Sequence, residues 1–112
     1  MNSVTLIGNL ATDVELKELD AERKVASFLL AVDRPVAKED GTPSADFFRV
    51  STWNRQAELC GQFLVRGRQV AVDGKLRSRS WEDADGKRRS AVEVVADRVE
   101  FLGVPDGKEG AS

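Results

Sequence analysis

One stretch of this sequence has the apolar spacing of an α-helix, and every other patterned stretch has the spacing of a β-strand. From Asn54 onward, apolar residues recur at helical intervals as Ala57, Cys60, Phe63 and Leu64. Runs of β-branched and apolar residues, or two-residue alternation, predict strands at residues 4–16, 25–32, 46–53, 68–79 and 91–101. In 25–32 the apolar residues occupy both faces, which implies burial on two faces or a subunit contact on one. A doubly wound α/β sheet needs helices on both of its faces, so a single helix is poorly compatible with that class.

The order of these elements is three strands, a helix and two strands. This is the order of a five-stranded Greek-key barrel of the oligonucleotide-binding (OB) fold, in which the helix lies between strands three and four. We therefore predict an all-β OB-fold domain over residues 1–103. Residues 104–112 are polar and contain glycine, so they are predicted to be a short disordered C-terminal end.

Local signals add detail to this prediction. Gly8 interrupts the first strand, so we expect a bulge near it. Asn54 suits the N-cap of the helix, and Gly67 suits its C-terminal stop. Residues 33–45 contain two prolines and lack periodicity, which is typical of a mobile loop. The turn former Gly86 marks the tip of a long hairpin between the last two strands.

The residue types exclude several kinds of site. The chain has no histidine and one cysteine, Cys60, which excludes a Cys/His metal site and an internal disulfide. The commonest general base is also missing, so we expect no cofactor and no enzymatic activity. No apolar run spans a bilayer and the N-terminus has no export signal, which predicts a cytoplasmic protein without membrane contact.

The charges are unevenly distributed along the chain. The net charge is −2, which taken alone argues against binding to a nucleic acid. However, residues 66–89 contain eight basic and four acidic residues, a local charge of +4, and the remainder carries −6. A basic segment in an acidic protein can hold a polyanion locally.

The third predicted strand has two different faces. One face suits a core and carries Phe48, Val50 and Thr52. The other carries Phe47, Arg49 and Trp53, and a guanidinium in a core would need a buried partner. This second face is therefore predicted to be exposed to solvent.

The fourth predicted strand places cations beside another aromatic ring. Opposite its apolar side, which carries Val70, Val72 and Leu76, alternation puts Lys75, Arg77, Arg79 and Trp81 on one face. Unpaired bases stack on exposed rings while cations contact phosphates, and duplex DNA offers no such free base faces. The pattern thus predicts largely sequence-independent binding of single-stranded DNA.

The sequence alone leaves other interpretations open. Phe47 and Trp53 could belong to the core, with Trp53 bracing Phe63, and the cations of the fourth strand could form an ordinary solvated edge. Residues 87–89 could pair with the acidic residues at 82–85 or contact phosphates. Asp83 and Asp85 are more typical of a turn than of a catalytic pair.

The chain resembles the bacterial single-stranded DNA-binding proteins that act in replication, recombination and repair. The resemblance covers about residues 2–103 and is carried by NSVTLIGNL (2–10), VASF (25–28), AELC (57–60), GRQV (67–70), GKLRSRSW (74–81) and VVAD (94–97). It implies a non-enzymatic, nucleoid-associated homotetramer that binds and protects single-stranded DNA, with dimers formed partly through the first strand. It also implies that bases stack on Phe47, Trp53 and Trp81, and that DNA contacts involve Arg49, Arg55, Arg66, Arg77 and Arg79.

Two departures from the family pattern affect what is expected. Val36 stands where some members have another stacking tryptophan, which predicts weaker or different binding at that point. The chain ends at Gly110-Ala111-Ser112 without the acidic tail tip that recruits replication and repair enzymes, so partners that depend on this tip are not expected. The missing tip and the acidic net charge leave an alternative function, a tetrameric OB-fold scaffold in a primosome or conjugation assembly.

Overall fold

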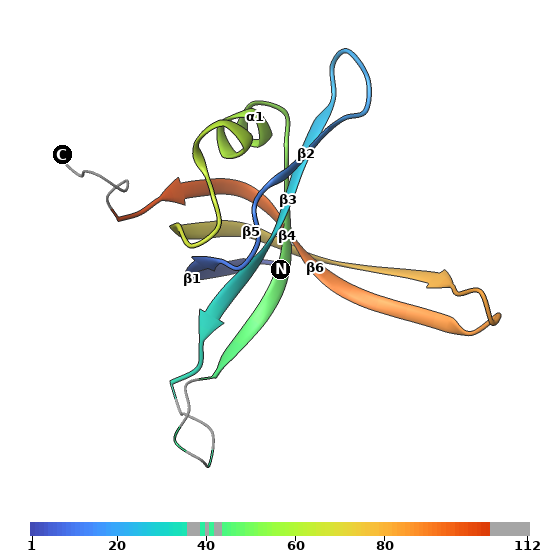
Figure 1. Ribbon diagram of the computed structural model, residues 1–112. Coiled ribbons are helices and arrows are strands. Elements are labelled where there is room, and N and C mark those ends of the chain that lie inside the picture. The colour runs from blue at the N-terminus through green and yellow to red at the C-terminus, as the bar shows by residue number, and fades with distance from the viewer. Residues whose placement is uncertain (36–38, 40, 42–43, 104–112) are drawn as a thin grey trace.

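A computed structural model describes residues 1–35, 39, 41 and 44–103 of the chain. The described residues form six strands and one helix (Figure 1). In chain order these are β1 (Val4–Leu10), β2 (Glu15–Glu18), β3 (Lys24–Asp33), β4 (Ala45–Trp53), α1 (Asn54–Phe63), β5 (Gln69–Glu82) and β6 (Arg88–Phe101). The helix follows the strand that carries Phe47 and Trp53, as predicted.

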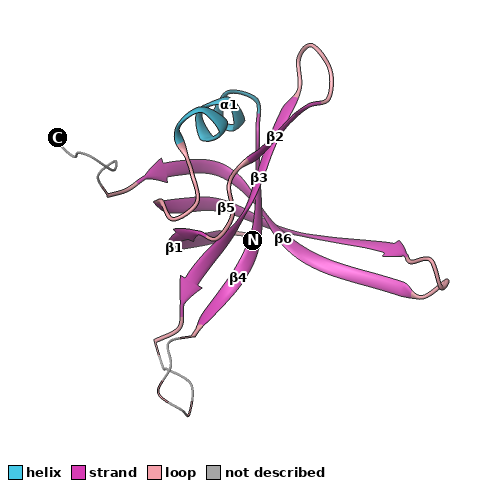
Figure 2. Cartoon of the chain, viewed as in Figure 1, coloured by secondary structure: helices cyan, strands magenta, loops and turns pink. Residues whose placement is uncertain are grey.

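The strands form one sheet that closes on itself. Their order is β1-β5-β6-β4-β3-β2, and β1 also pairs with β3 through Asn9↔Ala31 and Leu10↔Leu30. The short β4–β6 pairing is parallel, and the other pairings are antiparallel. Figure 2 shows the helix beside this ring of strands, where it packs mainly against β3 and β4.

The first predicted strand is two strands in the structure. The chain bends at residues 11–14, and β2 begins at Glu15. The predicted bulge at Gly8 is wrong, because β1 pairs with β5 without a break from Val4↔Gly74 to Asn9↔Gln69. Gly8 is needed for another reason: a Cβ atom there would lie 2.3 Å from the carbonyl oxygen of Ala31. The glycine therefore lets β1 approach β3 and close the ring.

The irregularity in the sheet lies between β5 and β6. The register shifts between Asp73 and Gly74, so that Asp97 is the additional residue on β6. A Cβ atom at Gly74 would lie 2.1 Å from the carbonyl oxygen of Val95. Beyond this point the two strands continue as a hairpin arm that reaches well outside the ring (Figure 1).

The core fills the inside of the ring with aliphatic side chains. The largest fully buried ones include Leu30, Val50, Val70, Val72 and Val94. Thr52 is also buried, and its hydroxyl donates a hydrogen bond to the carbonyl oxygen of Ala96 at 3.1 Å. The buried alternation in β4 confirms the core face predicted for that strand.

Both predicted ends of the helix are wrong in detail. Trp53 is the N-cap and makes no side-chain capping bond, while Asn54 has φ of 53° and its Oδ1 accepts a hydrogen bond from the Lys24 N–H at 3.1 Å. Asn54 therefore ties the start of the helix to β3. The helix ends at Phe63, and Gly67 lies in the following turn with φ of 94°.

No helix among the described residues has the length and apolar character needed to cross a membrane.

Cys60 provides a chemical probe of the core. It lies fully buried on the inner side of α1, and burial raises the pKa of its thiol to about 11. Because the thiolate is the reactive form, we expect Cys60 to resist a maleimide reagent at pH 8 in native buffer and to react in denaturant. Mass spectrometry over time measures this. A Cys60→Ala, Ser80→Cys protein, with its thiol on the exposed arm, serves as the reactive control, and rapid native labelling of Cys60 would contradict the packing described.

Candidate nucleic-acid interface

The outer face of β4 exposes two aromatic rings. Phe47 is 61% exposed and Trp53 is 40% exposed, with the exposed Arg49 between them on the same face. The ring that packs near Phe63 is Phe101, at a centroid distance of 6.4 Å. The interpretation of Phe47 and Trp53 as core residues is therefore wrong.

The outer face of β5 carries a row of cations that ends at an indole. Lys75, Arg77 and Arg79 occupy alternate positions on one face of the strand, and Trp81 follows them with 43% of its surface exposed. The guanidinium carbon of Arg79 lies 5.3 Å from the centre of the Trp81 ring, which is a cation–π distance. Leu76 lies on the opposite face but is exposed, contrary to the predicted apolar side, because β5 has left the core at that point.

Strand pairing brings these two rows to the same side of the sheet. Val95 of β6 pairs with Lys75 of β5 on one side and with Ser51 of β4 on the other. Ser51 in turn pairs with Ser27 of β3, and residues paired across strands share a face. A continuous outer face therefore runs from β5 across β6 and β4 to β3.

A groove crosses this outer face. It encloses about 200 Å³ and is lined by Glu15, Lys17, Val25, Ser27, Arg49, Ser51, Trp53, Arg79 and Glu93. The groove thus brings together three of the predicted site residues, Arg49, Trp53 and Arg79. Trp81 adjoins it through its contact with Arg79. Phe47, Lys75 and Arg77 lie on the same face beyond the lining of the groove.

The groove holds three cations and two carboxylates. Arg79 Nε lies 3.5 Å from an oxygen of Glu93. Within the part of the chain that the structure describes, Lys17 and Arg49 have no ion-pair partner. Their charges remain available to an anionic ligand.

Three residues that line the groove were not predicted as part of the site: Glu15, Lys17 and Glu93. Lys17 belongs to β2, a four-residue strand that is exposed throughout and therefore has no burial alternation to reveal it. The sequence did offer one indication that Glu93 faces away from the core: it is an acidic residue between the apolar residues Val92 and Val94 of the same strand.

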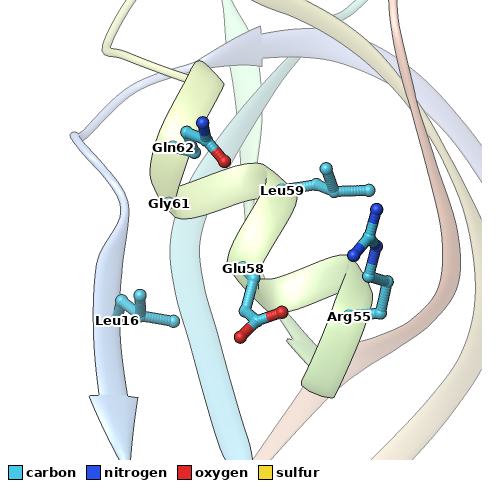
Figure 3. Close-up of a pocket in the computed structure, with 6 residues that line it drawn as sticks. All are labelled: Leu16, Arg55, Glu58, Leu59, Gly61 and Gln62. Atoms are coloured by element: carbon cyan, nitrogen blue, oxygen red, sulfur yellow. The ribbon is translucent and has the colours of Figure 1, made fainter.

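Two arginines taken from the family resemblance lie outside the groove lining. Arg55 is on α1 and lines a separate pocket of about 410 Å³ between the helix and β2, where Figure 3 shows it near Glu58 and opposite Leu16. Arg66 lies in the turn before β5, and its backbone N–H donates to Asp13 Oδ1 at 2.9 Å. Asp13 lines a hollow that shares Arg49 and Ser27 with the groove, so Arg66 lies near its continuation.

Charged side chains fix the tip of the hairpin arm. One oxygen of Asp83 accepts hydrogen bonds from the backbone N–H groups of Asp85 and Lys87, at 3.0 and 2.9 Å. Its other oxygen pairs with Arg89 Nε at 2.8 Å, and this side-chain hydrogen bond is the main reason that the pKa of Asp83 is lowered. Asp83 is therefore a turn former, and the ion-pair interpretation is correct for Arg89.

Val36, where a different mode of binding was expected, lies outside the described residues.

Among the described residues, no group of three or more histidine, cysteine, aspartate or glutamate side chains is placed to hold a metal ion.

The chain is similar in sequence to curated single-stranded DNA-binding proteins of several bacteria. Among curated relatives, the chain is 41% identical to the single-stranded DNA-binding protein 2 of Listeria innocua, over 100% of this chain and 70% of that protein. It is 45% identical to the single-stranded DNA-binding protein of Clostridium tetani (91% and 70%) and 40% identical to the single-stranded DNA-binding protein A of Bacillus subtilis (96% and 62%).

A solved structure and a family model agree with these relatives. The Plasmodium falciparum SSB in complex with ssDNA superimposes with a TM-score of 0.80 at 25% identity, covering 92% of this chain and 96% of that one. This likeness confirms the predicted all-β OB-fold class. The model of the single-strand binding protein family matches residues 1–102. The chain belongs to the single-strand binding protein family.

Proposed function

We propose that this protein binds single-stranded DNA on the outer face of its sheet and performs no chemistry on it. The observation that carries this proposal is the groove in which Arg49, Trp53 and Arg79 meet, flanked on the same face by exposed Phe47 and Trp81. Bases stack on the three rings, and the phosphates contact Arg49, Arg79 and their neighbours. Stacking accepts any base, so the binding is largely independent of sequence.

The sizes of the interactions favour a single strand over a duplex. Each base stacked on an aromatic side chain contributes about 1–3 kcal/mol. A duplex keeps its base faces stacked internally and would gain only phosphate contacts from this face. The rings therefore account for most of the discrimination, and the cations add attraction that salt weakens.

The wider role is proposed on the same basis. Residues 1–103 act as one DNA-binding domain that assembles into a homotetramer, and DNA is coated and protected in the cytoplasm during replication, recombination and repair. Curated relatives such as that of Bacillus subtilis are longer, and the chain spans 62% of that protein.

A fluorescence titration tests the DNA-binding proposal. Adding an unlabelled thymidine oligomer should quench the emission of Trp53 and Trp81 strongly and saturably, because both indoles become covered by bases. If Arg49, Lys75, Arg77 and Arg79 each neutralise one phosphate, log affinity should fall with log salt with a slope of about −3. A duplex of equal length is the control, and an RNA oligomer tests the choice of nucleic acid. Unchanged emission at low salt would contradict the proposal.

A further inference from the structure

The groove contains a carboxylate where a polyanion is proposed to bind. Glu93 lies on β6, directly opposite Arg77 of β5 in the register, and only 17% of its side chain is exposed. An acidic group near DNA phosphates lowers affinity through repulsion. Its presence in the groove therefore suggests a second role that offsets this cost. In the described part of the chain, its one charged partner within 4 Å is Arg79.

Arg79 is held between two groups. Its Nε lies 3.5 Å from Glu93, and its guanidinium carbon lies 5.3 Å from the centre of the Trp81 ring. The side chain is otherwise largely exposed, at 58%, and it lines the groove together with Trp53. Arg79 is thus the residue that connects the ring in the groove with the ring on the hairpin arm.

We propose that Glu93 is a positioning residue that holds Arg79 ready to receive a phosphate between bases stacked on Trp53 and Trp81. This inference rests on the proposed function. The ion pair restricts the Arg79 side chain from β6, and the indole restricts it from the other end. The guanidinium then meets the DNA backbone in a fixed place, so less side-chain freedom is lost on binding.

Two effects of opposite sign decide what the loss of Glu93 does. Removing its charge relieves repulsion with a phosphate about 7 Å away in water, which corresponds to about a threefold gain in affinity. Losing the restraint leaves Arg79 to be ordered on binding, and ordering a free arginine side chain corresponds to a loss of about tenfold. We therefore expect Glu93→Gln to weaken binding about threefold, although it removes a negative charge from a DNA site.

A double-mutant cycle tests the inference. Glu93→Gln and Arg79→Ala are made singly and together, and affinity for a fluorescein-labelled thymidine oligomer is measured by anisotropy. In the Arg79→Ala protein there is nothing left to position, so Glu93→Gln should now tighten binding by up to about threefold. The sign of the Glu93→Gln effect therefore reverses between the two backgrounds. An effect of the same sign in both backgrounds would overturn the inference.

Glu15→Gln is the matched control, because Glu15 lines the same groove and has no ion-pair partner among the described residues. It should tighten binding slightly in both backgrounds. Glu93→Asp keeps the charge but shortens the reach, so it should weaken binding in the wild-type background and have no effect beside Arg79→Ala. Thermal unfolding verifies that each variant folds. If the folded wild-type protein binds no oligomer, the proposed function fails; if it binds and the cycle shows no reversal, only the role of Glu93 fails.

Discussion

Replacing Trp53 and Trp81 together by alanine lowers the affinity for a thymidine oligomer by about 1,000-fold, because two stacking contacts of about 2 kcal/mol each are lost. Both rings are exposed on the outer face of the sheet, so the double variant should keep its fold. Anisotropy of a labelled oligomer measures the affinity, and circular dichroism verifies the fold. Trp81→Ala alone should cost about 30-fold.

Phe63→Ala is the matched control for the tryptophan variants. Phe63 is also an exposed aromatic residue, at 53%, but it lies at the end of α1 beside Phe101 and does not line the groove. Its removal should leave the affinity within about twofold of wild type. If the double tryptophan variant binds as tightly as the Phe63 variant, base stacking on Trp53 and Trp81 is not the source of affinity.

Changing Gly8 to alanine should destabilise the fold by about 3 kcal/mol, because the new methyl group would overlap the backbone of β3. Its Cβ would lie 2.3 Å from the carbonyl oxygen of Ala31, and a backbone oxygen in a paired strand cannot move aside as a side chain can. The closure of the ring through Asn9↔Ala31 must then open or shift. Urea unfolding followed by circular dichroism gives the change in the free energy of unfolding.

Gly61→Ala is the corresponding control for Gly8. A Cβ atom at Gly61 would lie 3.0 Å from Cδ2 of Leu16, the far end of a flexible side chain. Alanine also favours the interior of a helix over glycine by about 1 kcal/mol, so this variant should be neutral or slightly stabilised. A Gly8→Ala protein as stable as the Gly61→Ala protein would show that β1 does not approach β3 as closely as described.

The features predicted correctly from the sequence are those that a local pattern encodes. The two faces of β4 follow from strand parity, since a face bearing Phe47, Arg49 and Trp53 cannot be buried without a partner for the guanidinium. The same parity places Arg79 and Trp81 on one face of β5. The sequence thus predicted both halves of the candidate site.

The features missed depend on contacts between distant residues. β2 has no buried position, so its strand character comes from pairing with β3 and not from its own pattern. Asn54 was expected to cap its own helix, but its side chain bonds the backbone of Lys24, thirty residues earlier in the chain. The meeting of Glu93 with Arg79 likewise depends on the register between β5 and β6, which sequence periodicity does not specify.

In the hairpin arm, the residues proposed to bind DNA are separate from the residues that stabilise the fold. Past the bulge at Gly74, β5 is exposed on both faces to its end at Glu82, so its side chains contribute little to the buried core. If the arm contacts DNA as proposed, substitutions in this stretch should change the affinity for DNA with little effect on the stability of the fold. Single mutations in the arm, whether they arise in evolution or by design, should therefore tune the affinity for DNA while the fold is kept.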